Sequence, residues 1–160
     1  MTTLILAQES DFYSIAKMAK QIWYKHYPQF ITLAQVDYFL NKFYDIDAII
    51  LQQKLGQQFY IIMHNNETSG FISCSKFGNN LFIHKFYINT EMQRKNIGLE
   101  VMQYIQSNFK PIQNIQLAVN RLNIKSINFY FKVGFKIKSI ENFDIDGKYE
   151  MNDFIMEKCL

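Results

Sequence analysis

The chain has 160 residues, of which 49% are hydrophobic and 19% are charged, and its net charge is +3. This length suits one domain with its own core, and the balance of apolar and charged residues excludes a disordered chain. The sequence has no run of about 18 apolar residues, so we expect no membrane span. The first residues do not resemble a signal peptide, so we expect a cytoplasmic protein. A net charge of +3 without a clustered basic face does not indicate a nucleic-acid partner.

Cysteine and histidine are too few and too scattered to indicate a metal site. The chain has two cysteines, Cys74 and Cys159, and three histidines, His26, His64 and His84. Their spacing is not typical of metal ligands, so we expect no metal. Cys74 lies in an apolar run and is predicted to be a small buried side chain.

The first third of the chain is predicted to form a strand followed by helices. Residues 2–7 have the composition of a strand, and an amphipathic helix follows to about residue 26. A second helix is expected from about residue 32 and a shorter one over residues 46–55. Aromatic side chains cluster around the first helix connection and either pack the core or line a cleft for an acceptor: Trp23, Tyr24, Tyr27, Phe30 and Tyr38.

From residue 58 the pattern changes to that of strands. Apolar runs over residues 59–63, 70–76 and 81–88 are separated by turn signals rich in Asn and Gly, which predicts antiparallel neighbours. In a regular strand the side chains alternate between two faces. We therefore expect one face of the third strand to carry Phe82, His84, Phe86 and Ile88.

A polar loop, Gln93-Arg94-Lys95-Asn96-Ile97-Gly98, then opens an amphipathic helix. The first turn of a helix has free N–H groups and a positive dipole, so this loop is suited to hold a phosphate.

The last third of the chain alternates between the two patterns. A strand over residues 115–119 is followed by a helix over 124–133, capped by Asn123 and ended by Gly134. Two strands over residues 136–143 and 149–157 close the chain. The elements are summarised as β-α-α-β-β-β-α-β-α-β-β, in a single α+β domain over residues 1–160 with a mixed, mostly antiparallel sheet.

Two segments resemble signatures of the GCN5-related N-acetyltransferase (GNAT) superfamily. The loop at residues 93–98 resembles the family's Gln/Arg-x-x-Gly-x-Gly/Ala loop, with a strand before it and a helix after it. Residues 119–135 resemble the second signature, in which an Asn precedes a helix that ends in Phe-Tyr-x-x-x-Gly-Phe. The sequence departs from the family pattern at Asn96, where the first glycine of the loop is usual. Asparagine tolerates left-handed geometry and can cap a helix, so the departure weakens the motif without breaking it.

The resemblance implies that acetyl-coenzyme A is the acetyl donor and that no metal takes part. The strand through Phe86, Tyr87 and Ile88 would pair with the pantetheine arm, and Asn123 would bond to that arm from the other side. The pyrophosphate would lie against a set of loop residues: Gln93, Arg94, Lys95, Asn96, Ile97, Gly98 and Leu99.

The resemblance also implies a direct transfer in which Tyr130 protonates the leaving thiolate; the alternative is that Tyr130 only packs the helix. A glutamate that serves some family members as a base is replaced here by Phe82. His84 is on the same expected face, with an unperturbed pKa near 6.5, and is predicted to be the base or a residue of the acceptor cleft; the alternative is a structural histidine whose hydrogen bonds are satisfied.

The acceptor is predicted to be a primary amine of a small molecule or peptide. Acidic residues gather in the last hairpin, where they either attract a cationic amine or form an ordinary polar surface: Glu141, Asp144, Asp146, Glu150 and Asp153. A homodimer is left open, and the alternative function is a non-catalytic acyl-coenzyme A sensor. A dinucleotide-binding domain is excluded because the chain lacks a Gly-x-Gly-x-x-Gly loop.

Overall fold

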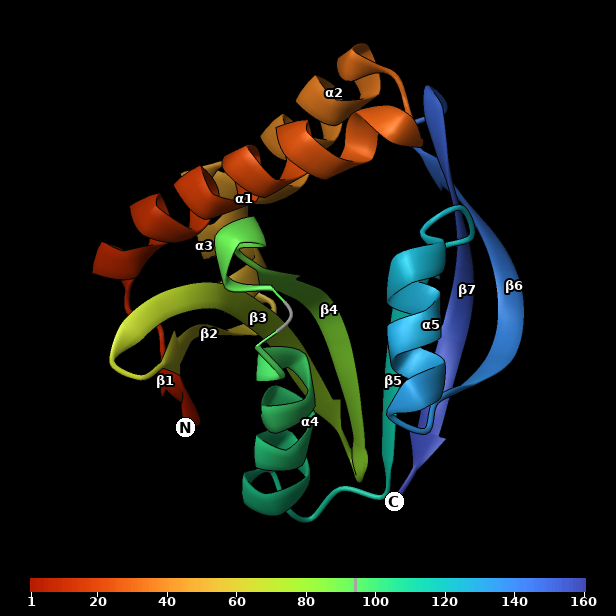
Figure 1. Ribbon diagram of the computed structural model, residues 1–160. Helices are drawn as coiled ribbons and strands as arrows, with labels where there is room; N and C mark the ends of the chain where they lie inside the picture. The colour runs from red at the N-terminus through yellow and green to blue at the C-terminus, as the bar shows by residue number, and fades with distance from the viewer. Residues whose placement is uncertain (94) are drawn as a thin grey trace.

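The protein, seen here as a computed structural model that describes residues 1–93 and 95–160, is built on one mixed sheet of seven strands (Figure 1). The strand order is β1-β2-β3-β4-β5-β7-β6, and every neighbouring pair is antiparallel except β4 and β5. The strands are β1 (Thr2–Leu6), β2 (Gln58–His64), β3 (Glu67–Phe77), β4 (Asn80–Ile88), β5 (Asn114–Asn120), β6 (Lys136–Ile145) and β7 (Tyr149–Cys159). The α-helices are α1 (Phe12–His26), α2 (Leu33–Tyr44), α3 (Ile46–Lys54), α4 (Ile97–Asn108) and α5 (Ile124–Lys132).

The predicted fold class and order are confirmed, with one correction. Three α-helices rather than two stand between β1 and β2, because the short helix predicted over residues 46–55 forms as α3. The local signals act as expected: Thr32 caps α2 by accepting a hydrogen bond from the Gln35 N–H, and Gly134 ends α5 with a φ of +95°. Within the described residues, no helix has both the length and the apolar character needed to cross a membrane.

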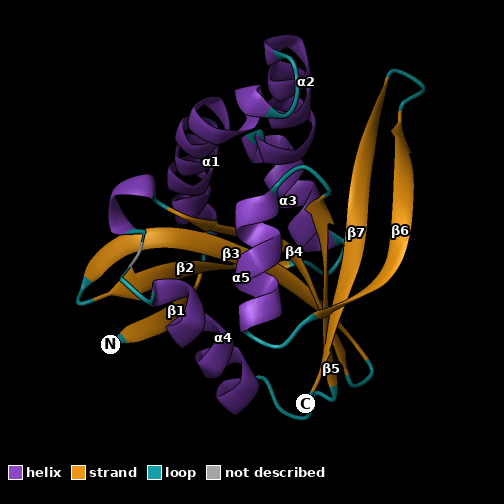
Figure 2. Cartoon of the chain, turned by 45° about the vertical axis from the view of Figure 1, so that its right-hand side comes forward, coloured by secondary structure: helices purple, strands orange, loops and turns teal. Residues whose placement is uncertain are grey.

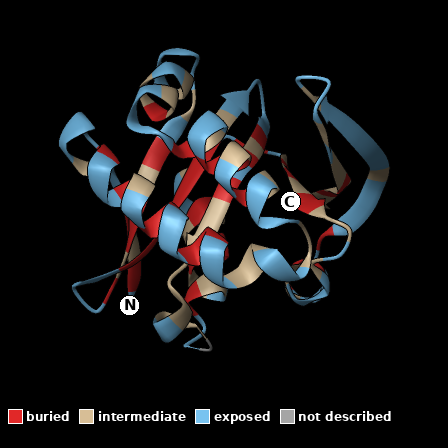
Figure 3. Ribbon diagram, turned by 90° about the horizontal axis from the view of Figure 1, so that it is seen from above, coloured by how far each residue is buried: buried red, intermediate tan, exposed pale blue. Residues whose placement is uncertain are grey.

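The sheet separates two cores (Figure 3). Helices α4 and α5 cover one face, where Val101, Ile105 and Ile127 pack against β3, β4 and β5. Helices α1, α2 and α3 cover the other face around Phe12, Trp23, Phe39 and Phe71. Helices from the first and second halves of the chain therefore cover opposite faces of the same central strands.

The expected alternation of side chains along β4 is wrong, because the strand contains a bulge. Ser73 of β3 pairs with Lys85, but the next residue, Cys74, pairs with Ile83, so His84 is an extra residue in β4. Such an insertion reverses which side chains face which side of the sheet. Ile83 and Phe86 consequently belong to the α4 and α5 core, and Lys85 turns to the opposite face.

The β6–β7 hairpin extends past the end of the sheet (Figure 2), and its tip lies beside α2 (Figure 1). At its tip, Asp146 accepts a hydrogen bond from the Tyr38 hydroxyl and pairs with the Lys42 ammonium at 2.6 Å. The ring of Tyr149 packs edge-on against Tyr38 and Phe39. These contacts fix the hairpin against the helical layer and enclose the space between them.

Candidate active site

The parallel pair at the centre of the sheet opens into a cavity. The ladder between β4 and β5 runs from Asn80 and Asn114 to Ile83 and Leu117, after which the two strands diverge (Figure 1). Divergence begins at the bulge, and the residues of β4 beyond it keep their pairing only with β3. The edge of β4 that faces β5 therefore presents backbone groups to a cavity of about 980 Å³.

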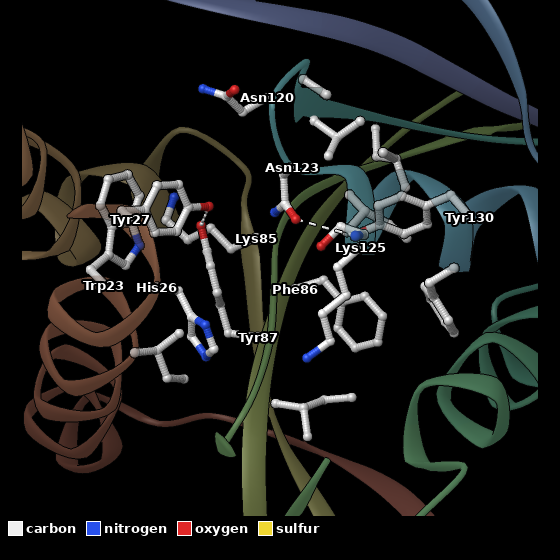
Figure 4. A pocket seen from close by; sticks show the side chains of 18 of the residues that line it. Trp23, His26, Tyr27, Lys85, Phe86, Tyr87, Asn120, Asn123, Lys125 and Tyr130 are labelled. Carbon is white, nitrogen blue, oxygen red and sulfur yellow. Dashed lines mark hydrogen bonds between the residues drawn. The ribbon is translucent and has the colours of Figure 1, made fainter. Parts of the chain in front are cut away.

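The cavity has two halves, one on each side of β4 (Figure 4). Side chains of α5 and the start of α4 line one half, which we call the cofactor half. Side chains of α1, β4 and β7 line the other, which we call the acceptor half. Tyr87 was predicted as a cofactor residue, but its side chain lies in the acceptor half, and only its backbone can serve the predicted role.

The start of α4 has the geometry that the loop motif requires. Asn96 adopts φ 59° and ψ 10°, the left-handed conformation that the usual glycine would supply. The predicted capping bond is wrong, because the Asn96 side chain makes no capping hydrogen bond. Gly98 is needed for helix packing, since a Cβ there would lie 2.9 Å from the Phe129 ring.

Lys125 contributes a cation that the sequence reasoning missed. Its ammonium donates to the Gln93 Oε1 at 2.5 Å, while the Gln93 Nε2 donates to the Ile88 carbonyl at 3.2 Å. Gln93 thus joins the end of β4 to α5 across the loop. Ile97, Gly98 and Leu99 line the cavity beside it, while Lys95 is exposed and Arg94 lies outside the described residues.

Helix α5 positions the two residues of the second signature. Asn123 caps the helix by accepting a hydrogen bond from the Ser126 N–H at 3.2 Å, which leaves its amide nitrogen for a ligand. Tyr130 is 8% exposed and lies on the cavity wall, and burial raises its pKa. The phenol is therefore protonated throughout the neutral range.

Three residues of the cavity wall have a buried polar atom with no hydrogen-bond partner among the described residues. The atoms are the Trp23 Nε1, the His26 Nε2 and the Asp153 Oδ1. A buried polar group without a partner is unfavourable, and native structures leave few of them. We therefore take this cavity as the candidate site for a polar ligand.

Asp153 is the most unusual of the three. The residue is 5% exposed, and it lies in β7 opposite Asn120 of β5 and Glu141 of β6. Burial raises the pKa of Asp153 to about 6, although the charge of Arg121 acts in the other direction. A carboxylate of that pKa is ionised at neutral pH and is suited to accept a proton.

Lys85 is a second buried ionisable group in the acceptor half. It is 7% exposed, and its ammonium donates to the Gln52 Oε1 at 2.6 Å and lies 5.2 Å from the centre of the Tyr44 ring. Burial lowers the pKa of Lys85 to about 7. No carboxylate of the described residues lies within salt-bridge distance of it.

His84 is less well placed for the proton transfer that we predicted. Its Nε2 shares a hydrogen bond with the Ser75 hydroxyl at 2.7 Å, and its ring packs against Phe82. The side chain of His84 is partly open to solvent, but desolvation of its ring by the neighbouring strands, with the nearby charge of Lys85, lowers the pKa of His84. Its role as a base stays a prediction, but a group with a lowered pKa is a weak proton acceptor.

Only some of the acidic residues of the last hairpin and of the clustered aromatic residues line the cavity. Of the five acids, Glu150 and Asp153 line the cavity, whereas Asp146 is paired at the hairpin tip and Asp144 bonds the turn. Of the aromatic cluster, Trp23, Tyr27 and Phe30 line the cavity, whereas Tyr24 and Tyr38 bond to aspartates. Cys74 is 2% exposed, as predicted. The described residues contain no group of His, Cys, Asp or Glu arranged to hold a metal ion.

We predict that Asp153→Asn stabilises the protein at neutral pH. The folded protein holds the Asp153 proton more tightly than the unfolded chain, so the cost of the ionised group is absent below pH 4 and complete above pH 6. The variant should raise the free energy of unfolding at pH 8 by up to about 3 kcal/mol and by much less at pH 4. Urea unfolding at both pH values measures this, with Glu141→Gln, an exposed acid on the facing strand, as the control. An equal gain in both variants would contradict the account of Asp153.

Comparison with known proteins places this geometry in a family. The model of the acetyltransferase (GNAT) family matches residues 13–135. The spermidine N(1)-acetyltransferase of Thermoplasma acidophilum is 24% identical over 155 residues, covering 92% of this chain and 91% of that protein.

Solved structures share the fold over the whole chain. The PaiA N-acetyltransferase of Thermoplasma acidophilum, in complex with coenzyme A, has a TM-score of 0.78 at 23% identity. The match covers 100% of this chain and 99% of that one. The ribosomal-protein-S18-alanine N-acetyltransferase of Escherichia coli has a TM-score of 0.71 at 13% identity, with 99% of this chain and 94% of that one covered. The family match and the shared fold agree with the open β4–β5 pair and the loop before α4, and we conclude that the chain belongs to the acetyltransferase (GNAT) family.

Proposed function

We propose that this protein transfers the acetyl group of acetyl-coenzyme A directly to a primary amine. The proposal rests on one cavity that is lined by three features: the unpaired edge of β4, the N-terminus of α4, and the Asp153 carboxylate, one oxygen of which has no hydrogen-bond partner. The first two suit an extended arm that ends in a pyrophosphate, and the third suits an ammonium group. The similarity to a spermidine N(1)-acetyltransferase supports an amine acceptor.

The residues on the cofactor half have distinct tasks. The β4 edge would pair with the pantetheine amides, and the first N–H groups of α4 would hold the pyrophosphate with help from Lys125. Bound there, acetyl-coenzyme A supplies an activated thioester. The hydroxyl of Tyr130, at the wall of the same cavity, would donate its proton to the sulfur as the carbon–sulfur bond breaks.

On the acceptor half, Asp153 would take the proton that the ammonium group must lose before its nitrogen can attack. The aromatic walls of Trp23 and Tyr27, whose rings stack 3.9 Å apart, would hold the cation beside it. Asp153 replaces His84 as our first candidate for the base, because its pKa is higher and its carboxylate has an unused acceptor atom.

The cofactor assignment is tested by Lys125→Met. We expect this change to weaken binding of acetyl-coenzyme A about tenfold, because it removes a charged contact to the pyrophosphate. Binding of S-acetylpantetheine, which lacks the pyrophosphate, should change less than twofold. Calorimetry with both ligands measures the difference, and Lys136→Met, an exposed lysine of β6, is the control. An equal loss of affinity for acetyl-coenzyme A and S-acetylpantetheine would show that Lys125 does not contact the pyrophosphate.

Tyr130→Phe tests the proposed acid. Loss of the hydroxyl should lower kcat about 100-fold, within the usual range for general acid catalysis, and should change the affinity for acetyl-coenzyme A less than threefold. Release of the coenzyme A thiol gives the rate, and Tyr104→Phe on α4 is the matched control. A kcat within threefold of the original would remove Tyr130 from the mechanism.

The pH dependence of kcat/KM, which reports the pKa values of the free enzyme, distinguishes the two candidate bases. A base accepts a proton only in its deprotonated form, so kcat/KM should fall as the pH drops through about 6, the pKa of Asp153. His84→Ala should keep this acidic limb, whereas Asp153→Asn should remove it and lower kcat about 100-fold. A limb that disappears in His84→Ala and persists in Asp153→Asn would restore His84 as the base.

A further inference from the structure

The acceptor half of the cavity has two poles of opposite charge, and together they select the class of acceptor. The following inference rests on the proposed function, because it concerns the amine that enters the same site. One pole is formed by Lys85, whose ammonium is a hydrogen-bond donor. The other is formed by Asp153 and Glu150 on β7.

The donor pole is built around Lys85. The Gln52 Oε1 that accepts from Lys85 is held in place because the Gln52 Nε2 donates to the Phe43 carbonyl at 2.9 Å. Gln57, whose Oε1 lies 3.5 Å from the ammonium, is held in turn by the Ser73 hydroxyl. These neutral amides orient the ammonium without neutralising its charge.

The Lys85 ammonium lies on the wall of the cavity, 5.2 Å from the centre of the Tyr44 ring. An ammonium in this place can bind a carboxylate oxygen of a ligand that enters the cavity.

The acceptor pole lies across the cavity on β7. Asp153 has a buried oxygen without a partner, and Glu150 lines the same wall. A buried carboxylate without a cation is unfavourable, as is a buried ammonium without an anion. A ligand with both charges would satisfy the two poles together.

We propose that the physiological acceptor is an amine that also carries a carboxylate, that is, an amino acid or a similar zwitterion. Its ammonium binds Asp153, and its carboxylate binds Lys85. A polyamine such as spermidine carries only cations, so it would leave the donor pole unpaired and place a positive charge toward Lys85. This acceptor class differs from that in the name of the spermidine N(1)-acetyltransferase to which the chain is similar.

The test compares a series of acceptors, called the ladder, in which the ammonium and the carboxylate are separated by an increasing number of carbon atoms. The preferred length measures the distance between the two poles. The ladder contains glycine, L-alanine, β-alanine, 4-aminobutanoate, 5-aminopentanoate and 6-aminohexanoate, each paired with the n-alkylamine of the same carbon number, and spermidine. Thiol release gives kcat/KM for each acceptor, and mass spectrometry identifies the acetylated product. We expect at least one amino acid to exceed both its alkylamine and spermidine by tenfold or more.

Two variants test whether Lys85 causes that preference. Lys85→Met removes the cation. Gln52→Glu keeps Lys85 but gives its ammonium an internal carboxylate, which competes with the carboxylate of the substrate. In both variants the ratio of kcat/KM for the preferred amino acid to that for its alkylamine should fall toward one. Lys54→Met, an exposed lysine of α3, should keep the ratio. Because the two variants change different side chains, a folding defect in one leaves the other as a test.

The outcomes separate this inference from the proposed function. If alkylamines or spermidine are acetylated as well as every amino acid, the zwitterion proposal is wrong and the acetyltransferase proposal stands. If the amino acid preference persists in both variants, Lys85 does not bind the carboxylate and the proposal is overturned. If acetyl-coenzyme A binds by calorimetry but no amine on the ladder is acetylated, the zwitterion proposal is wrong; if acetyl-coenzyme A does not bind, the proposed function itself fails.

Discussion

The site depends on one irregularity, the extra residue His84 in β4. The bulge exchanges the two faces of the strand, so that Ile83 packs under α4 while Lys85 points under α2 and α3. It also marks the point at which β4 parts from β5, which opens the centre of the sheet. A regular strand would have paired along its length and buried the backbone groups that now face the cavity. One inserted residue therefore creates both the unpaired edge and the buried lysine beside it.

The cavity illustrates how binding groups are kept at a cost to the fold. Trp23, His26 and Asp153 each leave a buried polar atom without a partner, and Lys85 carries a charge with only neutral hydrogen-bond partners. These arrangements persist because the two cores and the anchored β6–β7 hairpin fix the surrounding elements. The same groups become favourable when a ligand of complementary charge fills the space between them.

Much of this structure could be predicted from local signals in the sequence. Asn123 and Gly134 mark the ends of α5, and the left-handed tolerance of asparagine explains Asn96. The bulge could not be predicted, because nothing in the apolar run of β4 distinguishes an inserted residue from a regular one. The sequence could name Asp153 only as one of five acids in the last hairpin, and Lys125 was missed. Burial and an unpartnered oxygen single out Asp153, and the contact with Gln93, distant in sequence, singles out Lys125.

Hydrogen exchange of the backbone amides, with and without acetyl-coenzyme A, tests the central claim most directly. The account requires the ligand to pair with the edge of β4 that the bulge exposes and with the first turn of α4. Binding should slow exchange in segments that contain residues 85–88 and 97–99, and leave β1 and the outer strand β6 unchanged. Slowed exchange elsewhere, with no change in those two segments, would show that the open pair at the centre of the sheet is not the acetyl donor site.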